Sequence, residues 1–123
     1  MTEPELISHE ALLAENFTAL TGEAFPDDPM HTKMAILSHG TQKDPLFNYA
    51  NKAAQALFEY SFNEITQLPS RLSAEPAIQT ERTELLRAVK EKGYSKNYQG
   101  IRISKTGKRF LITKAIIWNL HDS

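Results

Sequence analysis

The segment RFLITKAIIWNL, residues 109–120, constrains the fold most, because apolar residues occupy both the odd and the even positions along it. Read as a strand, it presents Phe110, Ile112, Ile116 and Trp118 on one face and Leu111, Ala115 and Ile117 on the other. When only one face of a strand is covered, the residues of the other face face water, and every second position is therefore polar. We therefore expect this strand to be buried on both faces, by helices from the middle of the chain and by an N-terminal helix.

The sequence also predicts a β-hairpin that contains this strand and a helix near the N-terminus. The turn KTGK, residues 105–108, separates the strand from YQGIRIS, residues 98–104, and places Gly107 where a positive φ is wanted. Near the N-terminus, Leu6, Leu13, Phe17 and Leu20 recur at helical spacing, with Ile7 and Leu12 widening the stripe. This spacing predicts a helix over 4–20 that ends at Gly22, followed by a linker over 25–30.

The middle of the chain predicts two short strands and three helices. The strands are expected at 34–37 and 46–49, with a polar turn between them. Asn51 stands at an N-cap position before KAAQALFEY, in which Ala54, Leu57 and Phe58 share one face. Ser61 and Glu64 have the spacing of a capping box for a second short helix. A longer helix over 77–92 is expected to stop at Gly93.

This order of elements resembles a PAS domain, and four motifs narrow the resemblance. LSHGTQKDPLFNYANKAAQALFE, LPSRLSAEP, GIRISKTGKRF and WNL, in that order, are similar to the MEKHLA domain. That PAS-like module occurs alone in bacteria and algae and at the carboxyl end of some plant transcription factors. The resemblance implies an α+β fold, with a PAS-like antiparallel sheet, helices on one face and an N-terminal helix on the other. It divides the chain into an N-terminal helix, 1–24, and a PAS-like MEKHLA domain, 25–123.

Charge is unevenly distributed although the net charge is only −1. Residues 1–32 hold seven acids and no lysine or arginine, whereas residues 82–114 hold ten bases and two acids. The near-zero total favours packing of the acidic segment against the basic one, and nucleic-acid binding is the less favoured alternative. No apolar run is long enough for a membrane span, and the N-terminus is unlike a targeting peptide. We therefore expect a cytoplasmic protein that makes no contact with membranes.

The sequence contains no recognisable motif for catalysis, metal binding or phosphate binding. The chain has no cysteine, and none of its four histidines pairs with another at ligand spacing, so we expect no metal site. No serine lies in a nucleophile-elbow setting, and the glycines form no phosphate-binding loop. Among PAS-like proteins, the missing cysteine excludes the flavin and cinnamoyl photosensor chemistry, and the long helix lacks the haem-ligating histidine. We expect no cofactor and no enzymatic activity.

Two arginines are candidates for ligand contacts. In PSRLSAEP, Arg71 and Glu75 are four apart and form either a surface ion pair or a carboxylate-binding fork that faces a cavity. Arg102 lies between Ile101 and Ile103, so it is solvated if they are buried and faces a ligand if they are exposed. Aromatic residues that suit the core suit a pocket wall equally well. The candidate ligand-binding residues are Tyr49, Asn51, Phe58, Arg71, Glu75, Tyr98, Arg102 and Trp118.

Two classes of function stay open. The first is a sensory module that binds a small organic molecule, with anions among the candidates, between sheet and helices. The second is an interaction module without a ligand, which forms a homodimer through the N-terminal helix or a sheet edge. The resemblance also implies a fifth, central strand that the chain does not reach before Ser123. We therefore expect a truncated or association-dependent domain.

Overall fold

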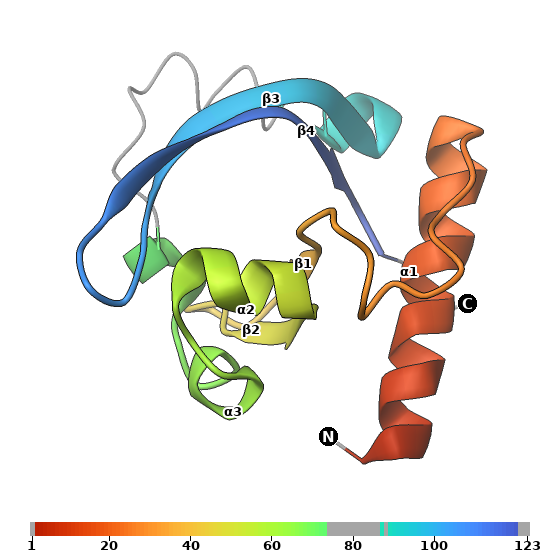
Figure 1. Cartoon of the computed structure of the whole chain (residues 1–123). Helices are drawn as coiled ribbons and strands as arrows, with labels where there is room; N and C mark the ends of the chain where they lie inside the picture. The colour runs from red at the N-terminus through yellow and green to blue at the C-terminus, as the bar shows by residue number, and fades with distance from the viewer. Residues whose placement is uncertain (1, 74–86, 88, 121–123) are drawn as a thin grey trace. The chain divides into compact units, whose positions relative to one another are not determined.

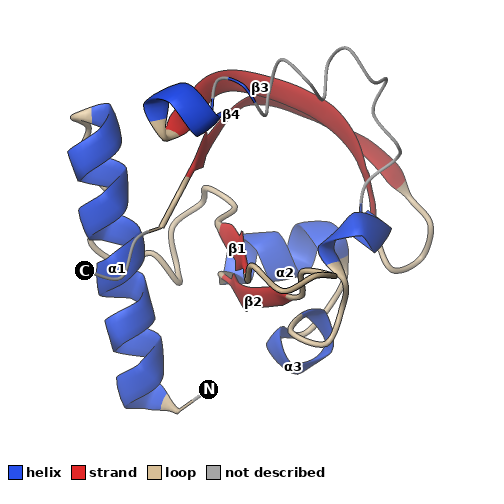
Figure 2. Ribbon diagram, turned by 180° about the vertical axis from the view of Figure 1, so that it is seen from behind, coloured by secondary structure: helices blue, strands red, loops and turns tan. Residues whose placement is uncertain are grey.

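The computed structural model describes residues 2–73, 87 and 89–120. Its elements follow the order α1 (Glu3–Thr21), β1 (Leu37–His39), β2 (Phe47–Ala50), α2 (Lys52–Phe58), α3 (Phe62–Ile65), the 3-10 helix η1 (Ser70–Ser73), β3 (Tyr94–Ile103) and β4 (Arg109–Trp118) (Figure 1). The described strands form two antiparallel pairs, β1–β2 and β3–β4 (Figure 2). This combination of helices and antiparallel strands confirms the predicted α+β class.

The chain divides into two compact units. One, here called the N-terminal unit, comprises Met1–Asp27, Ala77–Gln99 and Thr113–Ser123. The other, the central unit, comprises Asp28–Pro76 and Gly100–Ile112. The long β3–β4 hairpin therefore contributes its base to the N-terminal unit and its turn to the central unit. The expected boundary after residue 24 stays a prediction.

Helix α1 forms as its sequence predicts. Thr2 and Glu5 make a reciprocal capping box at its start, and Gly22, with φ of 73°, ends it in the left-handed conformation. Leu13 and Phe17 are buried, but Ile7 is 60% exposed, so the predicted widening of the apolar stripe through Ile7 is wrong.

The buried side of α1 packs within the N-terminal unit. The Phe17 ring lies 5.0 Å from that of Trp118 on β4 and 5.3 Å from that of Phe25, which also contacts Trp118. Lys96 of β3 pairs with Glu23 at 2.7 Å. These contacts confirm that the apolar stripe of α1 finds a partner on a strand and that an acid of the N-terminal segment pairs with the basic hairpin.

Strand β1 begins later than predicted. The expected strand over 34–37 is wrong, because the main-chain groups there bond to the Asn51 side chain and not to a neighbouring strand. The Asn51 amide donates to Met34 O at 2.6 Å and accepts from Ile36 N at 2.9 Å. Pairing with β2 starts only at Leu37, opposite Ala50, and continues to His39 in the segment that the sequence assigned to a turn. Strand β2 agrees with its prediction to within a residue.

The short helices follow their capping signals. Asn51 caps α2, and Ser61 and Glu64 form the predicted capping box of α3. Ala54 and Phe58 are buried, but Leu57 is 42% exposed, which corrects its assignment to the buried face. The predicted helix over 77–92 lies mostly outside the described residues. Its last turn ends as expected at Gly93, whose N–H donates to Val89 O.

The hairpin turn also forms as predicted. Gly107 has φ of 86°, and Ser104 N donates to Lys108 O at 2.9 Å. Burial of β4 on both faces is wrong, however, since Leu111 is 61% exposed. Strand alternation turns Leu111 away from the side on which Phe110 contacts Phe58, so the two faces of the hairpin differ.

Candidate functional site

The inner face of the hairpin, defined here as the face that carries Phe110 and Ile112, lies over the core of the central unit. The Phe110 ring meets the Phe58 ring edge-on at 5.2 Å, and Phe58 in turn packs against Phe47. Phe58 is 2% exposed, whereas Phe110 and Ile112 are only partly buried. A partly exposed apolar face therefore lies on a fully buried aromatic floor.

Arg102 belongs to this inner face. It stands two residues before Ser104, which is 4% exposed and turned toward the end of α2, so both residues lie on one side of β3. Ile101, on the opposite side, is 38% exposed. Ile103 is partly buried, so the two alternatives that the sequence left open for Arg102 both stay predictions.

The end of α2 holds the hairpin turn through a set of polar contacts, here called the clamp. The Glu59 carboxylate accepts hydrogen bonds from Ser104 Oγ and Thr106 Oγ1, which lower its pKa. Lys105 N donates to Phe58 O at 3.0 Å. Glu59 itself is left-handed, with φ of 63°, a conformation that costs about 1 kcal/mol in a residue other than glycine. The two hydroxyl bonds offset this strain.

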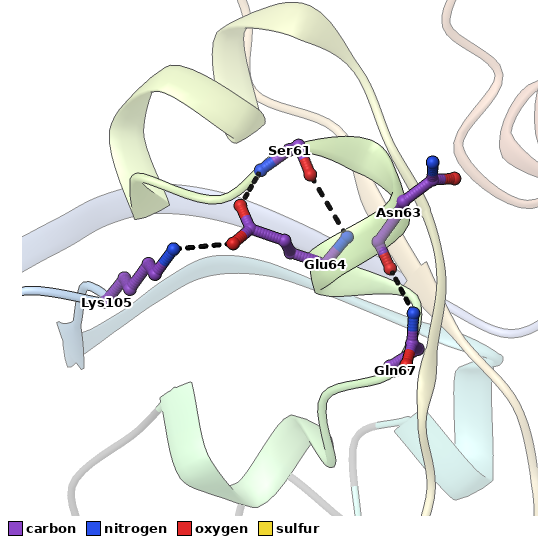
Figure 3. Close-up of polar contacts among 5 residues, drawn as sticks. All are labelled: Ser61, Asn63, Glu64, Gln67 and Lys105. Atoms are coloured by element: carbon purple, nitrogen blue, oxygen red, sulfur yellow. Dashed lines mark hydrogen bonds and ion pairs between the residues drawn. The ribbon is translucent and has the colours of Figure 1, made fainter.

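Helix α3 supplies the second half of the clamp (Figure 3). One Glu64 oxygen accepts from Ser61 N at 2.9 Å, and the other accepts from Lys105 Nζ at 2.5 Å. The hydrogen bond from Lys105 is the main cause that lowers the pKa of Glu64 to about 2, and the pKa of Lys105 is raised in return. One carboxylate thus caps a helix and holds the hairpin turn at once.

Asn51 is a buried residue of the central unit that connects several main-chain segments. Its side chain is fully buried; Oδ1 accepts from Ile36 N and Ala54 N, and Nδ2 donates to Pro29 O and Met34 O. Four bonds to the main chain use both donors and both main acceptor directions of the amide. Asn51 therefore joins the linker, β1 and α2, beyond the capping role that its sequence position predicts.

The structure places Arg71 on the surface. Its side chain is 65% exposed, and it donates from Nε and Nη2 to the two oxygens of Asp44, at 3.1 and 3.3 Å. The expected partner Glu75 lies outside the described residues. The pairing with Asp44 could not be read from local spacing, because the two residues are 27 positions apart.

The other candidates fall into different units. Tyr49 is fully buried in the central unit, where its ring meets that of Phe62 edge-on at 6.2 Å. Tyr98 and Trp118 belong to the N-terminal unit, and among the described residues the buried Trp118 Nε1 has no hydrogen-bond partner. Of the eight candidates, Phe58 and Arg102 thus lie in the central unit with Tyr49, Asn51 and Arg71, whereas Tyr98 and Trp118 lie in the other unit.

Comparison with known families identifies the chain. The family model for the MEKHLA domain matches residues 6–123. The chain belongs to the MEKHLA domain family. No significant match to a curated protein was found.

Solved structures show that this MEKHLA domain has a PAS-like fold. The PAS domain of a protein from Colwellia psychrerythraea aligns with a TM-score of 0.57 and 18% identity, covering 83% of this chain and 77% of that one. A variant of the protein Vivid aligns with a TM-score of 0.51 and 18% identity, covering 79% of this chain and 80% of that one. At these identities the likeness concerns the fold alone.

Two further properties of the MEKHLA domain bear on its chemistry. Within residues 2–73, 87 and 89–120, no group of three or more acidic or histidine side chains is arranged to hold a metal ion. In the same part of the chain, no helix combines the length and the apolar character needed to cross a bilayer.

Proposed function

We propose that this MEKHLA domain is a non-catalytic sensory module that binds a small organic molecule on the inner face of the hairpin. The observation that carries the proposal is the contrast in burial there: Phe110 and Ile112 keep partial exposure directly above a floor that includes the fully buried Ala54 and Phe58. Ligand sites are mostly apolar and aromatic, with a few placed polar groups, and Arg102 is such a group.

The clamp supports a role in signalling. A ligand between the hairpin and α2 would touch the two elements that Glu59 and Glu64 hold together. Binding shifts a conformational equilibrium only if the ligand prefers one arrangement of such elements. The inner face and the clamp share α2 and the hairpin, so occupancy of one can bias the other.

Native mass spectrometry of freshly purified protein tests the proposal. We expect a fraction of the chain to retain a small molecule that is released on denaturation. Phe110→Ala should abolish the retention, whereas Leu111→Ala, its neighbour on the opposite face, should preserve it. Equal retention by both variants, or a wild-type protein that never carries a ligand and binds none from a small-molecule library, would contradict it.

A second candidate function is homodimerisation without a ligand, and the outer face of the hairpin favours it. Ile101 is 38% exposed and Leu111 is 61% exposed. Ser104 and Lys108 close the turn; Ile101 lies three residues before Ser104, and Leu111 lies three residues after Lys108. They are therefore cross-strand neighbours, and together they form an exposed apolar patch. Sedimentation should then show a dimer that Leu111→Ser dissociates and that the control Leu57→Ser, on α2, leaves intact.

A further inference from the structure

We propose that the inner face selects an uncharged, apolar ligand and excludes the ionised counterparts of that ligand. The inference rests on the proposed function, and it assigns a ligand class to that site. Two observations in the central unit carry it. The side chains packed beneath the inner face are apolar, and the charged side chains around it are bonded or exposed to water.

The apolar core beneath the inner face is the first observation. Phe110 and Ile112 pack against a buried cluster from β2, α2 and α3, which consists of Phe47, Ala50, Ala54, Phe58 and Ile65. An apolar molecule placed there gains free energy, because its surface and that of Phe110 leave water together. An ion placed there loses its hydration, and this loss has to be offset by a charged or hydrogen-bonding partner.

The basic side chains of the hairpin are the second observation. The segment 100–112 carries four of them, Arg102, Lys105, Lys108 and Arg109. Lys105 donates to Glu64 at 2.5 Å, and Arg102 and Arg109 already have interactions of their own within the chain. Lys108 is exposed at the turn, so an anion that it attracts stays in water. A carboxylate on the inner face would therefore have to take a cation from its present partner.

The acids of the clamp are bonded in the same way. Glu59 accepts from Ser104 and Thr106, and Glu64 accepts from Ser61 N and from Lys105. A cationic ligand would have to compete with these donors, and displacing one donor leaves that donor without its partner. An ion of either sign thus loses hydration on the inner face, and the bonded groups of the hairpin and the clamp do not offset the loss.

The test uses the full chain and two sets of probes that differ only in charge: benzyl alcohol, benzoate and benzylammonium, and 1-hexanol, hexanoate and hexylammonium. Affinities are measured by protein-observed NMR titration, followed at the amides of Phe58, Phe110 and Ile112. We expect at least one alcohol to bind. Both ions of its set should bind about 10- to 100-fold more weakly, the range for a polar group that is buried without a partner.

A designed charge on the inner face sharpens the test. Ile112→Lys adds a cation there, so it should bind benzoate at least about 10-fold more tightly than the wild type does and benzyl alcohol more weakly. Leu111→Lys makes the same change on the opposite face and should leave all affinities unchanged. If Ile112→Lys does not fold, the comparison of the three charge states in the wild type decides alone.

The outcomes separate this inference from the proposed function. An ion that binds the wild type as tightly as its alcohol does would overturn the inference and leave the proposed function standing. The same holds if folded Ile112→Lys binds benzoate no more tightly than Leu111→Lys does. Failure of all six probes to perturb the amides of the inner face would overturn both.

Discussion

The two ends of the β3–β4 hairpin are held by different chemistry. At its base, in the N-terminal unit, Phe17 and Phe25 pack against Trp118, and Lys96 of β3 pairs with Glu23. At its turn, in the central unit, the clamp uses hydroxyl, main-chain and carboxylate groups around Glu59 and Glu64. An aromatic contact loses stability mainly when its packing changes, whereas the clamp also responds to protonation and salt. The turn therefore depends more on polar and charged contacts than the base does, and a ligand or a change of pH should alter the turn first.

The largest effect is expected from Phe58→Ala, which removes the ring on which Phe110 and Phe47 pack. Deleting a fully buried phenylalanine costs about 3–5 kcal/mol of unfolding free energy. Urea denaturation followed by circular dichroism measures this loss. The control Leu57→Ala, at the neighbouring exposed position, should cost under about 1 kcal/mol. Equal losses for the two variants would show that the buried floor has been assigned to the wrong residues.

Phe17→Ala should have the next largest effect, a loss of about 3 kcal/mol of unfolding free energy, because aromatic packing holds the base of the hairpin. Trp118 is the only tryptophan of the chain, so its fluorescence reports on the base alone. We expect a red-shifted emission in Phe17→Ala and an unchanged emission in the surface variant Ile7→Ala. An emission that does not move in Phe17→Ala would contradict the contact between α1 and β4.

Ser104→Ala should cost about 2 kcal/mol of unfolding free energy, because it removes two hydrogen bonds of about 1 kcal/mol each: the one that Ser104 donates to Glu59 and the one that it accepts from Lys108 N. Amide hydrogen exchange should become faster at the turn and stay unchanged around Trp118. The exposed hairpin residue Thr113→Ala serves as the control. Equal acceleration at both ends would show that the turn and the base do not respond separately.

The smallest effect is expected from acidification. The folded-state pKa of Glu64, about 2, lies below its ordinary value of 4.5, so its contribution to stability is present above pH 4.5 and is lost as the pH falls toward 2. Because the Glu64–Lys105 pair is exposed, the loss should be small and should shrink in high salt. Amide shifts of Lys105 and Gly107 should titrate below pH 4.5, and Glu64→Gln should abolish that titration. A titration that persists in Glu64→Gln would assign it to another carboxylate, such as Glu59.

Local signals made much of this fold predictable. The capping residues of α1, α2 and α3, Gly22 as a helix stop and Gly107 in the hairpin turn each act within a few residues, so they can be read from the sequence. The family resemblance added the order of elements. Leu111 and Leu57 were misassigned because an apolar pattern shows which residues can be buried and not which face is covered.

The site was less predictable because it depends on long-range pairings. Glu59 meets Ser104 and Thr106 from 45 and 47 residues away, and no local spacing indicates this contact. Arg71 has an acid four residues later in the sequence, yet the structure pairs it with Asp44. For Arg102 the alternation of residues left two orientations open, and only long-range contacts, such as that of the nearby Ser104 with Glu59, bear on the choice.

The most direct test of ligand binding on the inner face is a map of backbone amide shifts on adding, to ligand-free protein, the small molecule that native mass spectrometry finds retained. We predict perturbations at Arg102, Phe110, Ile112 and Phe58, with weaker changes at the clamp residues Glu59 and Ser104, and none at Leu111 or Phe17. Perturbations confined to the outer face around Ile101 and Leu111, or to the aromatic base around Trp118, would contradict this assignment.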